Sequence, residues 1–203
     1  SLSFSLSLSL SLSLSLSPSL SPSQTKYLQF LFYFTGVSDR FDRPWYQDKL
    51  VPYYMNRYCD EIKGMFNSNG RGYPDISAVG QNVPSAWQGR IQMAGGTSSS
   101  APIVAGILSL LNGERLASNL PPLGFMNPFL YTIGDEYPAA LNDIVAGNNS
   151  GGNRLLPDYT TCEYGFVAQP GWDAATGLGS LNFEKILPHV VPDPRDQNSP
   201  FSN

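Results

Sequence analysis

Charged residues, cysteine and histidine are all scarce in this sequence. Only 14% of the 203 residues are charged, with 12 basic against 16 acidic side chains, one histidine and two cysteines. The net charge of −4 excludes functions that need concentrated positive charge, such as binding nucleic acid or an anionic membrane surface. Cys59 and Cys162 allow at most one internal disulfide, and either could equally pair with a cysteine outside this chain.

The chain also lacks a long uninterrupted apolar run at its start. Residues 1–23 alternate serine with leucine, so a membrane-spanning helix is excluded there. A secretory signal is not indicated either, because the segment has neither a basic start nor a continuous apolar centre. A repeated TC dinucleotide would translate into this alternation. We therefore interpret residues 1–35 as a disordered, low-complexity segment that is not native to the protein and arises from a gene-model or splicing error.

What the sequence does contain is a glycine and hydroxyl cluster leading into an apolar stretch, GGTSSSAPIVAGILSLLNGERLAS at 95–118. Two neighbouring stripes have helical i, i+4, i+7 spacing, namely Ile103, Ile107 and Leu110, and Val104, Leu108 and Leu111. A helix that is apolar over so wide a face is typical of one buried beneath a sheet.

The boundaries of this helix can also be predicted. Ser99 or Ser100 is expected to supply the N-cap oxygen, with Pro102 in the first turn. The Pro121-Pro122 pair forbids continuation of the helix beyond it. Ser98 should therefore lie at or just before the helix N-terminus, where backbone amides and the helix dipole favour a negative oxygen. That is a suitable place for a serine whose attack creates an oxyanion, although serine clusters before helices commonly serve only as caps.

The residues before this stretch predict a parallel α/β unit. Residues 75–79 read as a buried strand, a loop surrounds Pro84, and residues 90–93 read as a second strand that delivers the chain to the glycines. A strand, a glycine turn and a helix form such a unit, with functional groups at the carboxyl ends of its strands. Asp75, which opens the first strand, is interpreted as a structural hydrogen-bond acceptor. Short helices are expected over 48–58 and 128–133.

Two aspartates further along the chain lie in glycine-rich loops. Asp143 follows a hydrophobic turn, and Asp173 lies in QPGWDAATGLGSLNF at 169–183. Calcium takes oxygen ligands from carboxylates and from carbonyls that turns expose, so the two loops hold the minimal ingredients of a calcium site. The alternative is that both aspartates merely form Asx-turns.

Several motifs in one order resemble the sedolisin family of serine-carboxyl peptidases, nearest its tripeptidyl-peptidase members. They are GRGYPDISA (70–78), GGTSSSAP (95–102), ILSLLN (107–112), PPLGFMNPFLY (121–131), NDI (142–144) and PGWDAATGLGSLNF (170–183). The resemblance implies an α/β fold, the C-terminal part of a subtilisin-like parallel-sheet domain. It assigns residues 36–192 to that domain and leaves 193–203 as a flexible tail.

The same resemblance implies the roles of individual residues. Ser98 would be the nucleophile. One calcium ion would be bound by two carboxylates and three backbone carbonyls, those of Asp143, Asp173, Ile144, Gln169 and Gly171. Gln169 replaces a small residue of many relatives, which a carbonyl ligand tolerates. Peptides or proteins would be the substrates, and the family's compartment would be extracellular, lysosomal or vacuolar.

The family's catalytic base is a carboxylate, which stays competent in acid where a histidine is protonated. His189, the single histidine, is read as a surface residue. The family's Glu and Asp triad members and its oxyanion Asp precede a segment that here reads TGVS at 35–38, and residues 1–35 show none of their motifs. We therefore expect a fragment of an acid peptidase that is inactive by itself. The alternative is a catalytically dead, truncated product that retains only calcium binding.

Overall fold

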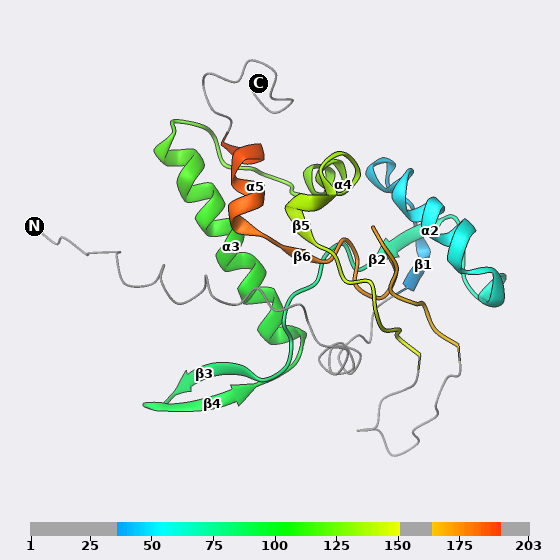
Figure 1. Cartoon of the computed structure of the whole chain (residues 1–203), viewed down its shortest axis with the longest axis horizontal. Helices are drawn as coiled ribbons and strands as arrows, with labels where there is room; N and C mark the ends of the chain where they lie inside the picture. Colours follow the sequence, from blue (N-terminus) through cyan, green and yellow to red (C-terminus); the bar gives the residue numbers. More distant parts are fainter. Residues whose placement is uncertain (1–35, 151–163, 192–203) are drawn as a thin grey trace, which may run out of the picture.

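A computed structural model of the chain describes residues 36–150 and 164–191 (Figure 1). The predicted low-complexity segment 1–35, the predicted tail 193–203 and Cys162 lie outside the described residues. Cys59 is buried and forms no disulfide with another described residue. Among the described residues, no helix has the length and apolar character needed to cross a membrane.

The described chain contains both helices and short strands, in agreement with the predicted α/β class. In order they are β1 (Gly36–Asp42), η1 (Trp45–Gln47), α2 (Leu50–Tyr58), η2 (Asp60–Ile62), β2 (Gly70–Tyr73), β3 (Val83–Trp87), β4 (Arg90–Ala94), α3 (Thr97–Ala117), α4 (Asn127–Glu136), η3 (Pro138–Ala140), β5 (Leu141–Asn142), β6 (Ser180–Leu181) and α5 (Phe183–Val190). The helices α2 and α4 overlap the short helices predicted over 48–58 and 128–133.

The strand pairing differs from the predicted parallel unit. In the described parts of the chain, β1 pairs with β2, β3 with β4 and β5 with β6, each antiparallel. The predicted strand at 90–93 is present as β4, but the strand predicted at 75–79 is wrong. The backbone of 75–79 makes single hydrogen bonds to a loop instead of a ladder to a strand.

A second correction concerns the loop predicted around Pro84, which is strand β3. β3 and β4 form a hairpin whose two turn residues, Gln88 and Gly89, have φ angles of 49° and 74°. Positive φ at both central residues matches the twist of the flanking strands, which is why this backbone favours a tight hairpin. The hairpin projects from the rest of the molecule (Figure 1).

Helix α3 begins earlier than its serines predicted. Gly96 is the N-cap, with φ 110°, so the prediction of Ser99 or Ser100 is wrong. Glycine accepts this backbone conformation without a steric penalty, and the chain enters the helix directly after it. Pro102 consequently lies inside the helix. Because proline has no amide hydrogen, it cannot donate to the Ser98 carbonyl four residues earlier.

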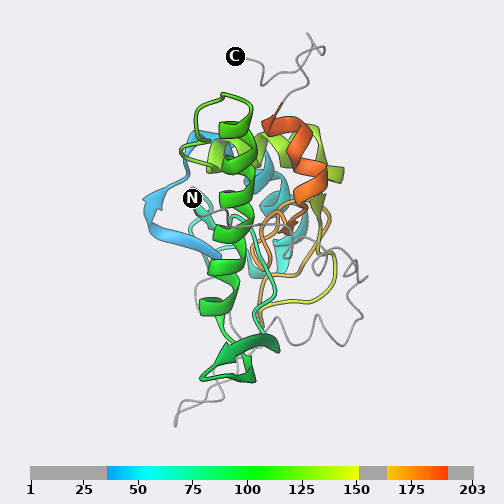
Figure 2. The ribbon, with the colours of Figure 1, turned by 90° about the vertical axis from the view of Figure 1, so that its left-hand side faces the viewer.

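The prediction that this helix is buried is wrong for half of its surface. Leu111 is buried, but Leu110 is 51% and Leu116 is 58% exposed. Helix α5 packs along one side of α3. The described chain leaves the other side uncovered, and Figure 2 shows α3 in front of the remaining elements. The apolar stripes are therefore shared between a packed side and an open side.

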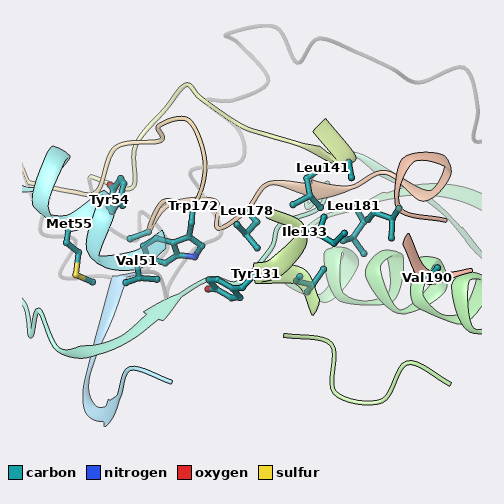
Figure 3. Close-up of a cluster of buried hydrophobic side chains, with 14 of the residues drawn as sticks. Val51, Tyr54, Met55, Tyr131, Ile133, Leu141, Trp172, Leu178, Leu181 and Val190 are labelled. Carbon is teal, nitrogen blue, oxygen red and sulfur yellow. The ribbon is translucent and has the colours of Figure 1, made fainter. Parts of the chain in front are cut away.

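One apolar cluster connects the elements (Figure 3). At one end, Tyr54 of α2 packs edge-on against Trp172, with ring centroids 5.6 Å apart. Leu178, from the loop before β6, and Ile133 of α4 extend the cluster toward Val190 of α5. Burying a side chain of this size contributes about 1.5–3 kcal/mol. Because Trp172 and Leu178 belong to the cluster, the loop that carries Asp173 is held firmly against the core.

Candidate active site and acidic loop pair

Ser98 is the second residue of α3 and is exposed. The first amides of a helix have no partner within it, and the dipole gives that end a partial positive charge. An oxygen that gains negative charge beside Ser98 would therefore be stabilised. The sequence prediction that Ser98 lies at the helix N-terminus is confirmed.

The turn that carries Ser98 is tied to the segment before the hairpin. The Gly96 amide donates to the Gly80 carbonyl at 2.6 Å. The Ser100 hydroxyl lies 3.2 Å from the carbonyls of both Ala78 and Val79. Successive helical residues are rotated by about 100°, so Ser98 and Ser100 point to roughly opposite sides of the helix. Ser100 anchors the turn, a role that its predicted capping function did not include.

Candidate general bases are not bonded to this serine in the part of the chain that the structure describes. No carboxylate or imidazole of residues 36–150 and 164–191 forms a hydrogen bond with the Ser98 hydroxyl. His189 lies on α5, where its ring contacts that of Tyr137 with centroids 4.4 Å apart. Burial lowers the pKa of His189 below its usual value.

The structure brings together the acidic residues that the sequence singled out. Asp143 directly follows β5, and its Oδ2 accepts a hydrogen bond from the Gly171 amide at 2.8 Å. Gly171 has φ 88°, a conformation in which glycine is favoured. The Ile144 carbonyl accepts a 3.5 Å hydrogen bond from the Thr176 hydroxyl. Residues far apart in the sequence thus meet at one place.

Asp173 is fully buried and is held by its own loop. Its Oδ1 accepts from the amides of Ala175 and Thr176 at 2.8 and 2.7 Å, and its Oδ2 accepts from the Gln169 amide at 3.1 Å. The Thr176 hydroxyl lies within 3.1 Å of both carboxylate oxygens. Sequence reasoning missed Thr176, although the Asp-x-x-Thr spacing is a signal for such a turn.

We call Asp143 and Asp173, with the loops that carry them, the acidic loop pair. Both carboxyl groups have pKa values above those of free aspartate. Burial raises the pKa of Asp143, and it raises the pKa of Asp173 to about 6 even though backbone amides oppose the shift. The ion pairs of the described residues are Arg43–Asp48, Lys49–Asp135 and Arg71–Asp75. Neither Asp143 nor Asp173 takes part in them. Asp173 is buried, whereas Asp143 is exposed. The two carboxylates lie beside loop carbonyls and have no basic partner among the described residues, so they form an oxygen-rich group of the type that binds hard cations.

The segment 75–80 links the acidic loop pair to Ser98. At one end, the Asp75 carbonyl accepts from the Leu178 amide at 2.9 Å, and the Ser77 amide donates to the Gly179 carbonyl at 2.9 Å. At the other end, carbonyls of residues 78–80 hold the first turn of α3. A continuous chain of contacts therefore connects the two sites.

The side chain of Asp75 stabilises the start of this segment. Its carboxylate accepts hydrogen bonds from Arg71, Gln47, Asn127 and Tyr131. The interpretation of Asp75 as a structural acceptor is confirmed. Its donors come from η1, β2 and α4, and only the tertiary structure identifies them.

Curated proteins that are similar in sequence to this chain include tripeptidyl-peptidases. No family model matches the chain. Tripeptidyl-peptidase 1 of Dictyostelium discoideum is 40% identical over 156 residues, which cover 77% of this chain and 25% of that protein. Tripeptidyl-peptidase SED4 of Arthroderma otae is 42% identical over 163 residues, which cover 77% of this chain and 27% of that protein. The chain thus spans about a quarter of the length of the curated relatives it matches.

A solved structure gives the same result. Pseudomonas sedolisin, a serine-carboxyl proteinase solved with pseudo-iodotyrostatin, matches with a TM-score of 0.57 and 27% identity, over 77% of this chain and 36% of that chain. The fold and the sequence thus identify a relative of α/β serine peptidases. The chain belongs to the sedolisin family and corresponds to part of its catalytic domain.

Proposed function

We propose that the chain contributes the nucleophile and a calcium site to a serine peptidase that works in acid, as a tripeptidyl-peptidase or an endopeptidase. The observation that carries this proposal is the exposed position of Ser98 in the first turn of a long helix, within a chain related to tripeptidyl-peptidases. The compartment would be extracellular, lysosomal or vacuolar.

Ser98 would act by nucleophilic attack. Its hydroxyl oxygen bonds to the carbonyl carbon of a peptide substrate while its proton passes to a general base, and the amine product leaves with a proton. The carbonyl oxygen, which gains negative charge, would lie toward the first-turn amides of α3. A carboxylate base from outside the described residues would stay ionised in acid and accept the proton.

Calcium would be held by the side chains of Asp143 and Asp173 and by the carbonyls of Ile144, Gln169 and Gly171. These groups fit the ion because they are all oxygen donors, and because neither carboxylate has a basic partner among the described residues. When bound, the ion supplies positive charge that offsets theirs. Leu178 and Gly179, at the end of the same loop, form hydrogen bonds with segment 75–80, which supports the turn that carries Ser98.

The second candidate is an inactive, truncated product that retains only calcium binding. It is favoured by the lack of a base bonded to Ser98 among the described residues. A serine hydroxyl is a poor nucleophile without a positioned base. We therefore expect the chain by itself to be inactive at any pH.

The test compares the 203-residue chain alone with the chain co-expressed with the unmatched part of Dictyostelium tripeptidyl-peptidase 1. Cleavage of a tripeptide-amide reporter in acid is measured for the wild type, Ser98→Ala and Ser99→Ala. Activity is expected only in the co-expressed sample, with a loss of about 10⁴-fold in Ser98→Ala and little loss in Ser99→Ala. Ser98-dependent activity of the chain alone would show that it contains a base, and full activity of Ser98→Ala would refute the nucleophile.

A further inference from the structure

The sequence contains one acceptor motif for N-linked glycosylation, Asn148-Asn149-Ser150, which the function proposed above does not use. The motif lies among the described residues, on the segment that continues from Asp143. A bulky glycan is compatible with a fold only where the asparagine side chain reaches the surface. The contacts of Asn148 therefore decide whether the motif is a site.

The side chain of Asn148 forms a turn within its own motif. Its Oδ1 accepts hydrogen bonds from the Ser150 hydroxyl at 2.6 Å and from the Ser150 amide at 3.1 Å. Three consecutive residues form this turn, so it needs no distant segment and can exist before the chain folds. The carboxamide nitrogen Nδ2, the atom that accepts a glycan, forms no hydrogen bond with another described residue.

The backbone directs this side chain to an accessible face. Asn148 pairs with Val167 in an antiparallel bridge between residues 147–149 and 166–168, which we call the bridged segments. Paired residues share one face, and successive residues alternate between faces. Val167 is 42% exposed, so the half-buried Asn148 lies on the accessible side. Asn149 lies on the other side, where its Oδ1 accepts from the Phe166 amide at 2.6 Å.

The bridged segments lie at the edge of the molecule on the side away from α3 (Figure 1). Ser98 is at the start of that helix, so the serine and the motif lie apart. The chain also leads from the bridged segments to Asp143 and Gln169, but Asn148 is not one of the proposed calcium ligands. A group attached to Asn148 would therefore leave the proposed catalytic and calcium-binding residues unmodified.

We propose that Asn148 is N-glycosylated in the secretory pathway. In the transfer, Nδ2 forms a bond to the anomeric carbon of an oligosaccharide linked to a lipid diphosphate, while the bond from that carbon to the diphosphate oxygen breaks. The lipid diphosphate leaves, and one proton of Nδ2 passes to a base of the transferase. The proposal rests on the extracellular, lysosomal or vacuolar compartment proposed above, and not on Ser98 or calcium.

The glycan fits the local contacts. Oδ1 is not altered by the transfer, so both hydrogen bonds from Ser150 remain in the glycosylated chain. The hydrogen bonds of the bridge connect the residues on either side of the pair, not Asn148 and Val167 themselves. Side chains approach each other most closely in a pair of this kind. The first sugar would therefore lie over Val167 and shield this exposed apolar side chain from water.

The site is tested by translating the full chain, preceded by a cleavable secretory signal, with endoplasmic reticulum microsomes that supply the transferase and its oligosaccharide. Peptide-N-glycosidase then converts a glycosylated asparagine to aspartate, which mass spectrometry locates. The wild type is compared with Asn148→Gln and Ser150→Ala, which destroy the motif, and with Asn149→Gln and Ser150→Thr, which keep it. A secreted glycoprotein translated in the same reaction shows that the microsomes are active.

One glycan at Asn148 in the wild type, Asn149→Gln and Ser150→Thr, and none in Asn148→Gln or Ser150→Ala, is the expected result. A wild-type chain without a glycan, beside a glycosylated control protein, would overturn the proposal. A glycan that persists in Asn148→Gln would also overturn it. Because the signal is supplied and neither Ser98 nor calcium is needed, failure of the proposed peptidase function would not change this readout.

A second measurement tests the face to which Asn148 is assigned. Thermal unfolding of the glycosylated wild type is compared with that of the same protein after an endoglycosidase has trimmed the glycan to one sugar. The intact glycan should leave the melting temperature equal or higher, because it extends from an accessible face. A lower melting temperature with the intact glycan would show that it disturbs the packed side, and would contradict the proposed site.

Discussion

The Asp75 carbonyl accepts a hydrogen bond from the Leu178 amide at 2.9 Å, across more than one hundred residues of sequence. The same aspartate ties η1, β2 and α4 together through its carboxylate. Asp75 therefore joins the elements around the apolar cluster to the loop that carries Asp173. At its other end, segment 75–80 is bonded to the turn that carries Ser98, because the carbonyls of Ala78 and Gly80 accept hydrogen bonds from Ser100 and Gly96.

Substitution of Asp75 should be strongly destabilising. Asp75→Ala removes the acceptor for the buried Gln47 amide and for the Tyr131 hydroxyl, and leaves Arg71 without its ion pair. We expect a loss of about 2–4 kcal/mol in the free energy of unfolding, measured by urea denaturation. Asp48→Ala, at an exposed partner of Arg43, is the control and should cost less than about 1 kcal/mol. Equal losses in the two variants would contradict the role assigned to Asp75.

Calcium should stabilise the folded chain through Asp143 and Asp173. At about 100 times its dissociation constant, a ligand adds about 2.7 kcal/mol to the free energy of unfolding. Asp143→Asn should lose this increment but melt like the wild type in chelator, because its amide oxygen can still accept from Gly171. Thermal unfolding with calcium and with chelator measures both.

Asp173→Asn should behave differently from Asp143→Asn. Its amide nitrogen would replace an oxygen that accepts from the Gln169 amide or from the amides of Ala175 and Thr176. A buried donor facing a donor costs about 1–3 kcal/mol, so this variant should melt at a lower temperature in chelator as well. A wild-type melting temperature that calcium does not change would refute the site.

Two helical glycines should respond oppositely to alanine. Gly106 of α3 has open space at its Cβ position, so Gly106→Ala should raise the free energy of unfolding by about 0.5–1 kcal/mol through helix propensity. Gly134 of α4 has Leu178 Cδ2 2.5 Å from the position of a Cβ, so Gly134→Ala forces that side chain to move and should be destabilising. Urea denaturation compares the two, and a stabilising Gly134→Ala would contradict the packing described for Leu178.

Protonation of His189 should oppose folding. Its pKa is lowered in the folded protein by burial, so the folded state binds this proton less readily than the unfolded state. The stabilising contribution is therefore present above the unfolded pKa of about 6.5 and is lost as the pH falls through the folded pKa. Between about pH 7.5 and about pH 5, the melting temperature of the wild type should fall further than that of His189→Gln. A larger fall in the variant would reverse the assigned direction.

Several features of the fold were predictable because they depend on local sequence. Short helices were predicted at the positions of α2 and α4, and the glycines and hydroxyls before an apolar stretch placed Ser98 at a helix start. Local signals were less reliable for the boundaries. Serine is a common N-cap, but Gly96 takes a backbone conformation that allows the helix to begin before Ser99. The hairpin of β3 and β4 was missed because Pro84 was read as a loop signal, although a proline is tolerated on an edge strand.

By itself, the sequence determined the family, the approximate positions of α2, α3 and α4, and the two aspartates in glycine-rich loops. These depend on motif order and on the spacing of neighbouring residues. Only the tertiary structure decided that Asp143 meets Gly171, that Thr176 holds Asp173 and that Asp75 connects to Leu178. It also decided that half of α3 is exposed. The physical reason is that helical spacing identifies apolar sides, whereas their burial depends on distant segments that pack against them.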